Sequence, residues 1–409
     1  MKSESLASTE RIGPCDSCSA LGINGPDTVL GVERDLMERT PVESCKASAI
    51  LRNRMPELDS LRGVAILMVL VYHGFFWSTG LTGLSGFAKL FVRATSCGWL
   101  GVNLFFVLSG FLITGILLES RSEPHYFRRF YTRRALRILP ALYALLTLLI
   151  LTGFPGRPYL LVSFLYLSNV APLAGITVTY PMLWSLAVEE HFYLLWPAVV
   201  RKLSSGALAT TILAILIAEP AVRTASFWFG LRDGLSSYTW LVADGLAVGS
   251  GLALFVRSTW FSRRGLTQLS LGLLAAATLM ATLGAPYGIL TRQQLLGSGL
   301  QLTIFNFLFG GLLGGALLLG SSQWGFLVNR TGLQFLGNIS YGLYLVHWLA
   351  FYGYDAMVKA HWPALYPSAG RFGVIVLRFG VASAVAILVA ALSRHYFEEP
   401  FLRLKDRLA

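Results

Sequence analysis

The stretch LDSLRGVAILMVLVYHGFFW, residues 58–77, decides the fold class of this chain. Ten mostly apolar residues separate Arg62 from His73, and the apolar run continues to Trp77. A helix of about 20 apolar residues crosses the roughly 30 Å hydrocarbon core of a bilayer. A titratable side chain inside such a segment is costly, so it is normally paired or faces a polar cavity. The stretch therefore predicts a membrane-spanning helix and raises the question of what surrounds His73 inside it.

The composition of the whole chain also indicates a membrane protein. Of its 409 residues, 55% are hydrophobic and 13% are charged, whereas a soluble domain carries about 25% charged residues. We therefore predict an all-α polytopic membrane protein with about ten transmembrane helices. The predicted spans are residues 62–80, 99–119, 138–154, 182–200, 206–222, 238–256, 266–285, 295–320, 333–352 and 374–393.

The distribution of basic residues sets the predicted orientation of these spans. Cytoplasmic connections are enriched in arginine and lysine. A cytoplasmic N-terminus puts the arginine-rich segment 121–137 and the basic residues of 257–264 inside. If the short, proline-bounded stretch 158–173 also crossed the membrane, the basic residues of 257–264 would lie outside. The excess of basic residues on the cytoplasmic side would then be reversed in the second half of the chain. We therefore expect the stretch 158–173 to be external or re-entrant. Both termini are then predicted to be cytoplasmic.

The N-terminal segment, the cysteines and the net charge exclude several classes of function. Residues 1–54 are polar and lack an apolar period, which predicts a disordered cytoplasmic tail before one membrane domain, 55–409. Cys15 and Cys18 resemble half of a zinc site, but only Cys45 is available in the tail as a third ligand, so we predict no metal site. The net charge is +12. In a membrane protein this charge indicates orientation and lipid contact rather than nucleic-acid binding.

The spacing of Arg62 and His73 gives the first candidate site. Eleven residues at 100° each complete about three helical turns, so both side chains lie on one face, about 16 Å apart along the axis. Arg62 then lies at the cytoplasmic boundary and His73 near the middle of the bilayer. Packing of a lone histidine and the lining of a polar cavity are both compatible with this arrangement, and Arg62 on the same stripe favours the cavity.

A second cluster lies in LWSLAVEEHFYLLWP, residues 183–197. Ser185, Glu189 and Tyr193 recur every four residues and therefore form one stripe on a helix. An interfacial cap is the alternative interpretation, but a carboxylate beside hydroxyl groups favours a site centred on Glu189. The candidate substrate-binding residues are Trp184, Ser185, Tyr193, Asp244 and His347.

A third cluster is the predicted cytoplasmic loop FRRFYTRRALRILP, residues 127–140. Contact with anionic lipid head groups would explain much of its charge. Paired arginines also bind phosphates bidentately, and aromatic rings stack on purines. We expect a coenzyme with several phosphates to bind here. The candidate residues are Arg128, Arg129, Tyr131, Arg133, Arg134 and Arg137.

Together these segments resemble the membrane-bound acyltransferase-3 family, the inner-membrane O-acyltransferases. The resemblance rests on LDSLRGVAILMVLVYH, GVNLFFVLSGFLIT, FRRFYTRRALRILPALY, LWSLAVEEHFYLLWP, LGNISYGLYLVH and FEEPFLRL, in the family's order, over about residues 55–409. Two positions depart from the family pattern: Asn103 stands where an acidic residue is common, and His191 where glutamine is usual.

The resemblance implies transfer of an acyl group, most often acetyl from acetyl-CoA, to a carbohydrate hydroxyl at a bacterial inner membrane. Acetyl-CoA would be a co-substrate, with no permanently bound cofactor. His73, Glu189 and Arg62 match the catalytic positions, with His73 as general base and Glu189 as its possible orienting partner. A macrolide or lipid acceptor, a longer acyl donor, or a non-enzymatic transporter of a sugar-lipid or anion are the alternatives. The oligomeric state is not indicated by the sequence.

Overall fold

The computed structural model describes residues 50–52, 54–77, 83–231, 237–363 and 371–408. Within these ranges every regular element is a helix and no strand occurs. The expected tail lies outside them except for its last few residues, as do Cys15, Cys18 and Cys45. The prediction of an all-helical chain is confirmed for the described part.

The helices follow the predicted apolar runs. The α-helices of the first half are α2 (Pro56–Val71), α4 (Gly86–Thr95), α5 (Gly101–Glu119), α6 (Tyr126–Leu151), α7 (Arg157–Ser163) and α8 (Leu183–Lys202). Those of the second half are α9 (Ser205–Trp228), α10 (Asp244–Val256), α11 (Arg263–Gly284), α12 (Leu295–Gly320), α13 (Thr331–Asn338), α14 (Ser340–His361), α15 (Phe372–Leu392) and α16 (Glu399–Leu408). Two π-helical turns, η1 (Tyr72–Phe76) and η8 (Ser393–Glu398), continue α2 and α15, and a 3-10 turn, η2 (Ser96–Leu100), joins α4 to α5.

Seven helical segments of the described chain are long and apolar enough to cross a membrane, and they coincide with seven of the predicted spans. The three other predicted spans also form helices but fall short of this standard. α10 has only 13 residues, the window 333–352 is divided between α13 and α14, and α8 carries several charged residues. The stretch 158–173 forms the seven-residue α7 followed by turns, too short a helix to span. The chain is thus a multi-pass helical membrane protein.

The arginine-rich segment differs from the sequence prediction. We expected a loop over residues 127–140, but α6 begins at Tyr126 and continues through Pro140 to Leu151. Arginine, leucine and alanine are good helix formers, and the helix continues past its single proline, Pro140. The arginines are therefore fixed on successive turns of a helix rather than displayed on a flexible connection.

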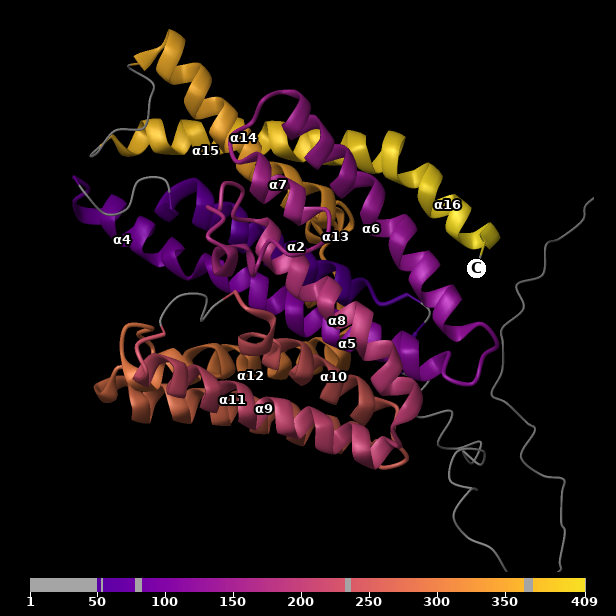
Figure 1. Cartoon of the computed structure of the whole chain (residues 1–409). Helices are drawn as coiled ribbons and strands as arrows, with labels where there is room; N and C mark the ends of the chain where they lie inside the picture. The colour runs from indigo at the N-terminus through magenta and orange to yellow at the C-terminus, as the bar shows by residue number, and fades with distance from the viewer. Residues whose placement is uncertain (1–49, 53, 78–82, 232–236, 364–370, 409) are drawn as a thin grey trace, which may run out of the picture.

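The helices are arranged around α5 (Figure 1). α9, α10, α11 and α12 pack together on one side, and α10 packs directly against α5. On the other side lie α6, α14, α15 and α16. In the most apolar part of the segment Gly86–Glu119, 78% of the residues are buried inside the protein. The corresponding share is 17% for α9 and for α11. α5 is therefore the central helix, and α9 and α11 face the surroundings.

Candidate functional site

Three cavities adjoin one another inside the bundle. The basic cavity, about 370 Å³, lies between α5 and the start of α6. The central cavity, about 80 Å³, shares Arg134 and Arg137 with it. The aromatic cavity, about 550 Å³, shares Val102, Phe106 and Tyr344 with the central one. Because neighbouring cavities share lining side chains, the three cavities form a row from the arginine-rich end of the bundle to His73.

His73 lines the aromatic cavity and is largely buried. Its Nδ1 lies 2.9 Å from the carbonyl oxygen of Val69. A carbonyl can only accept a hydrogen bond, so Nδ1 carries the proton and Nε2 of the neutral imidazole has a free lone pair. The second histidine, His347, packs against it with ring centroids 5.1 Å apart. The geometry leaves His73 with the nitrogen that a general base needs.

The backbone around His73 is a π-helical turn, η1, rather than the regular helix expected from the sequence. Such turns interrupt the regular hydrogen-bond ladder and are frequent at functional sites. Arg378 of α15 donates from Nη1 to the carbonyl of Gly74 at 3.1 Å. Its Nε and Nη2 bind both carboxylate oxygens of Asp355 at 2.6 and 2.7 Å. α14 and α15 therefore hold the turn that carries His73.

Arg62 and His73 line adjoining cavities rather than a single one. Arg62 lies in the central cavity with Ser185, Glu189 and Tyr193, which confirms that these three residues of α8 share a face. Ser109 Oγ donates to one oxygen of Glu189 at 2.8 Å and Tyr193 Oη to the other at 3.1 Å. Both carboxylate oxygens thus have partners, and no Glu189–His73 contact occurs among the described residues.

The basic cavity contains most of the predicted coenzyme-binding residues. Arg129, Arg133, Arg134 and Arg137 line it. Arg129 is paired with Glu123. The guanidinium of Arg134 lies 3.9 Å above the ring of Tyr193, so it joins the basic cavity to the central one. Arginines spaced along one helix face are suited to several phosphates of one ligand.

Two predicted residues of this segment lie outside the lining of these cavities. Arg128 is exposed on α6. Tyr131 donates from Oη to the carbonyl of Leu194 at 2.7 Å and so attaches α6 to α8. Their spacing in the sequence did not distinguish them from the cavity arginines, because that distinction depends on which side of α6 faces α5 and α8.

The predicted substrate-binding residues are divided between different surroundings. Trp184 lines the aromatic cavity and Ser185 and Tyr193 the central one. His347 is fully buried beside His73, with Nδ1 2.8 Å from the Tyr344 carbonyl.

Asp244, fully buried, is bound instead to Arg223 at 2.9 Å and to Thr303 at 2.6 Å, and it is not among the residues that line the three cavities. The buried Asp244 carboxylate is therefore paired with a cation of another helix. The partner was missed because we predicted that α9 ends before Arg223, whereas it continues to Trp228. The spacing of Glu219 and Arg223, one helical turn apart, was the available signal.

The fold and the cavities define a multi-pass helical membrane protein with an arginine-lined cavity at one end of a row of neighbouring cavities and a buried histidine at the other. The sequence model of the family described as "Acyltransferase domain" matches residues 55–394. The chain belongs to this acyltransferase family.

Similar proteins include several O-acetyltransferases. The chain is 29% identical over 381 residues to "Putative peptidoglycan O-acetyltransferase YrhL" of Bacillus subtilis, covering 85% of this chain and 54% of that protein. It is 34% identical over 167 residues to a peptidoglycan O-acetyltransferase of Listeria monocytogenes, covering 36% and 24%. The chain thus spans about half or less of the length of these relatives. No solved structure matches.

Proposed function

We propose that this protein is a membrane O-acyltransferase that transfers an acyl group, in the first place acetyl, from acyl-CoA to a hydroxyl of a carbohydrate. The observation that carries the proposal is a row of three neighbouring cavities with shared lining residues, which begins at an arginine-lined cavity and ends at a buried histidine with a free Nε2. The family and the names of the relatives support the reaction class. We place the protein in a bacterial inner membrane, as the resemblance to the family implies.

The donor occupies the basic and central cavities in this proposal. Arg133 and Arg134 bind phosphates of the coenzyme, and the narrow central cavity admits its extended thioester arm past Arg62 and Tyr193. Tyr344 lies where the central and aromatic cavities meet, its hydroxyl 2.6 Å from Ser185 Oγ. The thioester carbonyl then reaches the side of Tyr344 on which His73 lies.

The acceptor occupies the aromatic cavity. Its hydroxyl oxygen attacks the thioester carbonyl while Nε2 of His73 takes the hydroxyl proton. The new carbon–oxygen bond forms, the carbon–sulfur bond breaks, and the proton passes to the departing thiolate to give free coenzyme A. Glu189, held by Ser109 and Tyr193, offsets part of the positive charge of Arg62 and Arg134 along the donor path. No metal is needed for any of these steps.

The first test is the replacement His73→Ala in the full chain, assayed with radiolabelled acetyl-CoA and cell-envelope glycan. Loss of a general base lowers turnover by about 10²–10⁴-fold, so we expect transfer to fall by at least about 100-fold. His361→Ala is the matched control, because His361 is exposed at the end of α14. Full transfer by His73→Ala would refute the general-base role, and uptake of a sugar-lipid or anion without thioester cleavage would indicate a transporter.

A further inference from the structure

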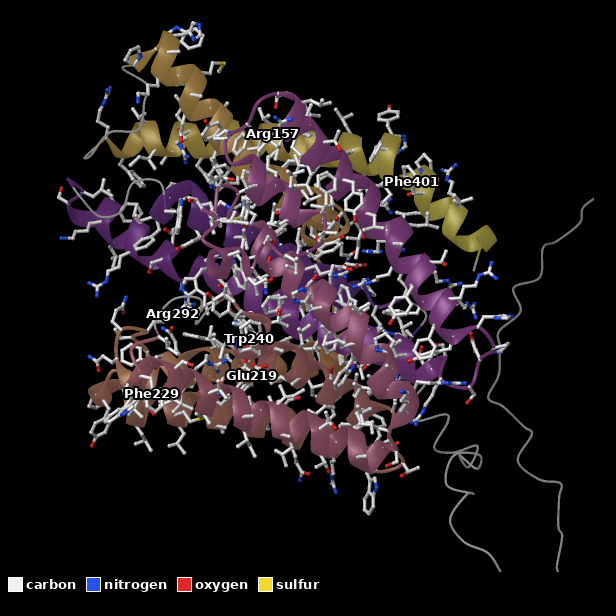
Figure 2. The ribbon with its side chains drawn as sticks, in the orientation of Figure 1. Arg157, Glu219, Phe229, Trp240, Arg292 and Phe401 are labelled. Atoms are coloured by element: carbon white, nitrogen blue, oxygen red, sulfur yellow. The ribbon has the colours of Figure 1, made fainter. Side chains whose placement is uncertain are left out.

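The aromatic cavity contains a guanidinium whose terminal nitrogens are left free for a ligand. Arg292 lies in the connection between α11 and α12, among the sticks that project between the α5 layer and the α9–α12 group (Figure 2). Its guanidinium carbon lies 3.7 Å from the centroid of the Trp99 ring. Its Nε donates to Gln301 Oε1 at 2.9 Å. Neither terminal nitrogen has a hydrogen-bond partner among the residues that the structure describes.

Two neighbours hold this guanidinium in a fixed orientation. Gln301 donates from its own amide nitrogen to the carbonyl of Leu290, which turns its amide oxygen toward Arg292. Trp99 is fixed in turn by an edge-to-face contact with Phe305, with ring centroids 6.1 Å apart. A planar guanidinium stacked on an indole and bonded through Nε presents its remaining edge, which is the edge that binds carboxylates and phosphates bidentately.

The charge of Arg292 is not balanced within the cavity. The described lining contains no aspartate or glutamate, and Arg292 is its only permanently charged side chain. Burial lowers the pKa of Arg292 to about 10, so the side chain stays protonated at neutral pH. A partly buried charge without a counter-charge is unfavourable, and an anionic ligand would supply the missing partner.

The remainder of the lining is suited to a sugar ring. Trp77, Trp99 and Trp184 provide apolar faces, and Asn103 and Gln293 provide hydrogen-bonding groups. Pyranose rings have apolar faces of C–H bonds with hydroxyl groups at their edges, so they need both kinds of surface. At about 550 Å³ the cavity has the size of a small-molecule site.

We propose that Arg292, stacked on Trp99, binds an anionic group of the acceptor, so that this protein selects a saccharide that carries a carboxylate or phosphate. The identification of this ligand as the acceptor rests on the proposed function. The anionic group is held at Arg292 while a hydroxyl of the same saccharide lies at His73, because both side chains line one cavity. Arg292 is a specificity residue in this arrangement and does not touch the reacting atoms.

The test compares three probes that differ in one group: a glucuronic acid–N-acetylglucosamine disaccharide, its uronamide, and the 6-phosphate of the corresponding neutral disaccharide. Binding to the purified full chain in detergent is measured by calorimetry. Hydrogen bonds to charged groups are stronger than neutral ones, so we expect the acid or the phosphate to bind the wild type at least about tenfold more tightly than the uronamide. Whichever of the two anionic probes binds more tightly shows whether the site takes a sugar carboxylate or a sugar phosphate.

Arg292→Gln is expected to remove the preference for the anionic probe while leaving uronamide binding within about twofold, since only the charged hydrogen bonds are lost. Arg93→Gln is the matched control, because Arg93 of α4 is exposed and does not line the cavity. Equal binding of acid, phosphate and uronamide by the wild type, equal weakening of all three by Arg292→Gln, or no binding of any probe would overturn the inference.

The two proposals fail in different ways. If the anionic probe binds through Arg292 but no acyl group is transferred, the acyltransferase function is wrong and the anion site stands. If acyl transfer proceeds equally well to acid and uronamide in both wild type and Arg292→Gln, the anion site is wrong and the acyltransferase function stands. Acetyl-CoA binding is unchanged by Arg292→Gln in either case, because Arg292 does not line the basic or central cavity.

Discussion

At the scale of single residues, two local contacts orient the buried imidazole of His73, for which we propose a role in proton transfer. The Val69 carbonyl fixes which nitrogen is protonated, and the π-turn fixes where the ring lies. Arg378 acts on that turn through Gly74 while remaining outside the lining of the cavity. We therefore expect Arg378 to act as a positioning residue, whose removal would shift His73 without removing any side chain that lines the cavity.

Replacement of Arg378 by methionine tests this role. The variant leaves the Asp355 carboxylate and the Gly74 carbonyl without their arginine, and misplacement of a catalytic group by about 1 Å can cost about 100-fold in rate. We expect kcat to fall at least about tenfold, with the KM for acetyl-CoA changed less than about twofold, because the donor cavity is untouched.

The control for Arg378→Met is Arg394→Gln. This change breaks a comparable ion pair, that of Arg394 with Glu399 at 2.7 Å, which lies outside α2 and the turn η1 that carries His73. Steady-state kinetics of both variants separate positioning from general destabilisation. A parallel loss of kcat in both, or a rise in KM alone after Arg378→Met, would contradict the positioning role.

At the scale of elements, glycines determine how closely the central helices approach. A Cβ atom on Gly249 of α10 would lie 2.0 Å from the carbonyl oxygen of Val107, and one on Gly110 of α5 would lie 2.0 Å from that of Leu246. The nearest atoms belong to the backbone of the opposite helix, so a methyl group at either glycine would force α5 and α10 apart. Gly249 and Gly110 thus allow the backbones of α10 and α5 to pack closely, as small residues do between membrane helices.

Gly249→Ala is therefore expected to destabilise the protein by about 1–3 kcal/mol, the usual cost of overpacking. Gly251→Ala, two residues along the same helix, is the control: its nearest neighbouring atom outside the helix would lie 3.6 Å from the new Cβ, an ordinary contact. Alanine is the better helix former, so this variant should be neutral or slightly stabilising. Thermal unfolding in detergent measures the stability of both variants. Equal Tm values for the two would show that α10 and α5 do not pack this closely at Gly249.

At the scale of the whole molecule, the cavities have opposite chemical characters at their two ends. The basic cavity is lined by arginines of α6 beside the short connection from α5. The aromatic cavity includes residues of the connection between α11 and α12. Donor and acceptor are therefore expected to enter from different ends and meet near Tyr344 and His73. The positive-inside rule predicts that the basic end is cytoplasmic, where coenzyme A thioesters are made.

The double variant Arg133→Ala, Arg134→Ala tests the donor end. Loss of two charge-assisted phosphate contacts should raise the KM for acetyl-CoA by at least about tenfold, while the affinity for the saccharide probes stays unchanged. The matched control is Arg263→Ala, Arg264→Ala, an exposed arginine pair at the start of α11. An unchanged KM for acetyl-CoA in the Arg133→Ala, Arg134→Ala variant, or an equal rise of this KM in the control, would show that the basic cavity does not bind the donor.

The sequence by itself determined the properties that depend on neighbours along one helix. Apolar length predicted the membrane spans, helical period predicted the common face of Ser185, Glu189 and Tyr193, and composition predicted an all-α membrane protein. Only the tertiary structure decided which distant groups meet, such as Arg292 with Trp99 and Arg378 with Gly74. The physical reason is that helical geometry is set by local backbone hydrogen bonds, whereas the partner of a buried charge is set by how helices far apart in the chain pack together.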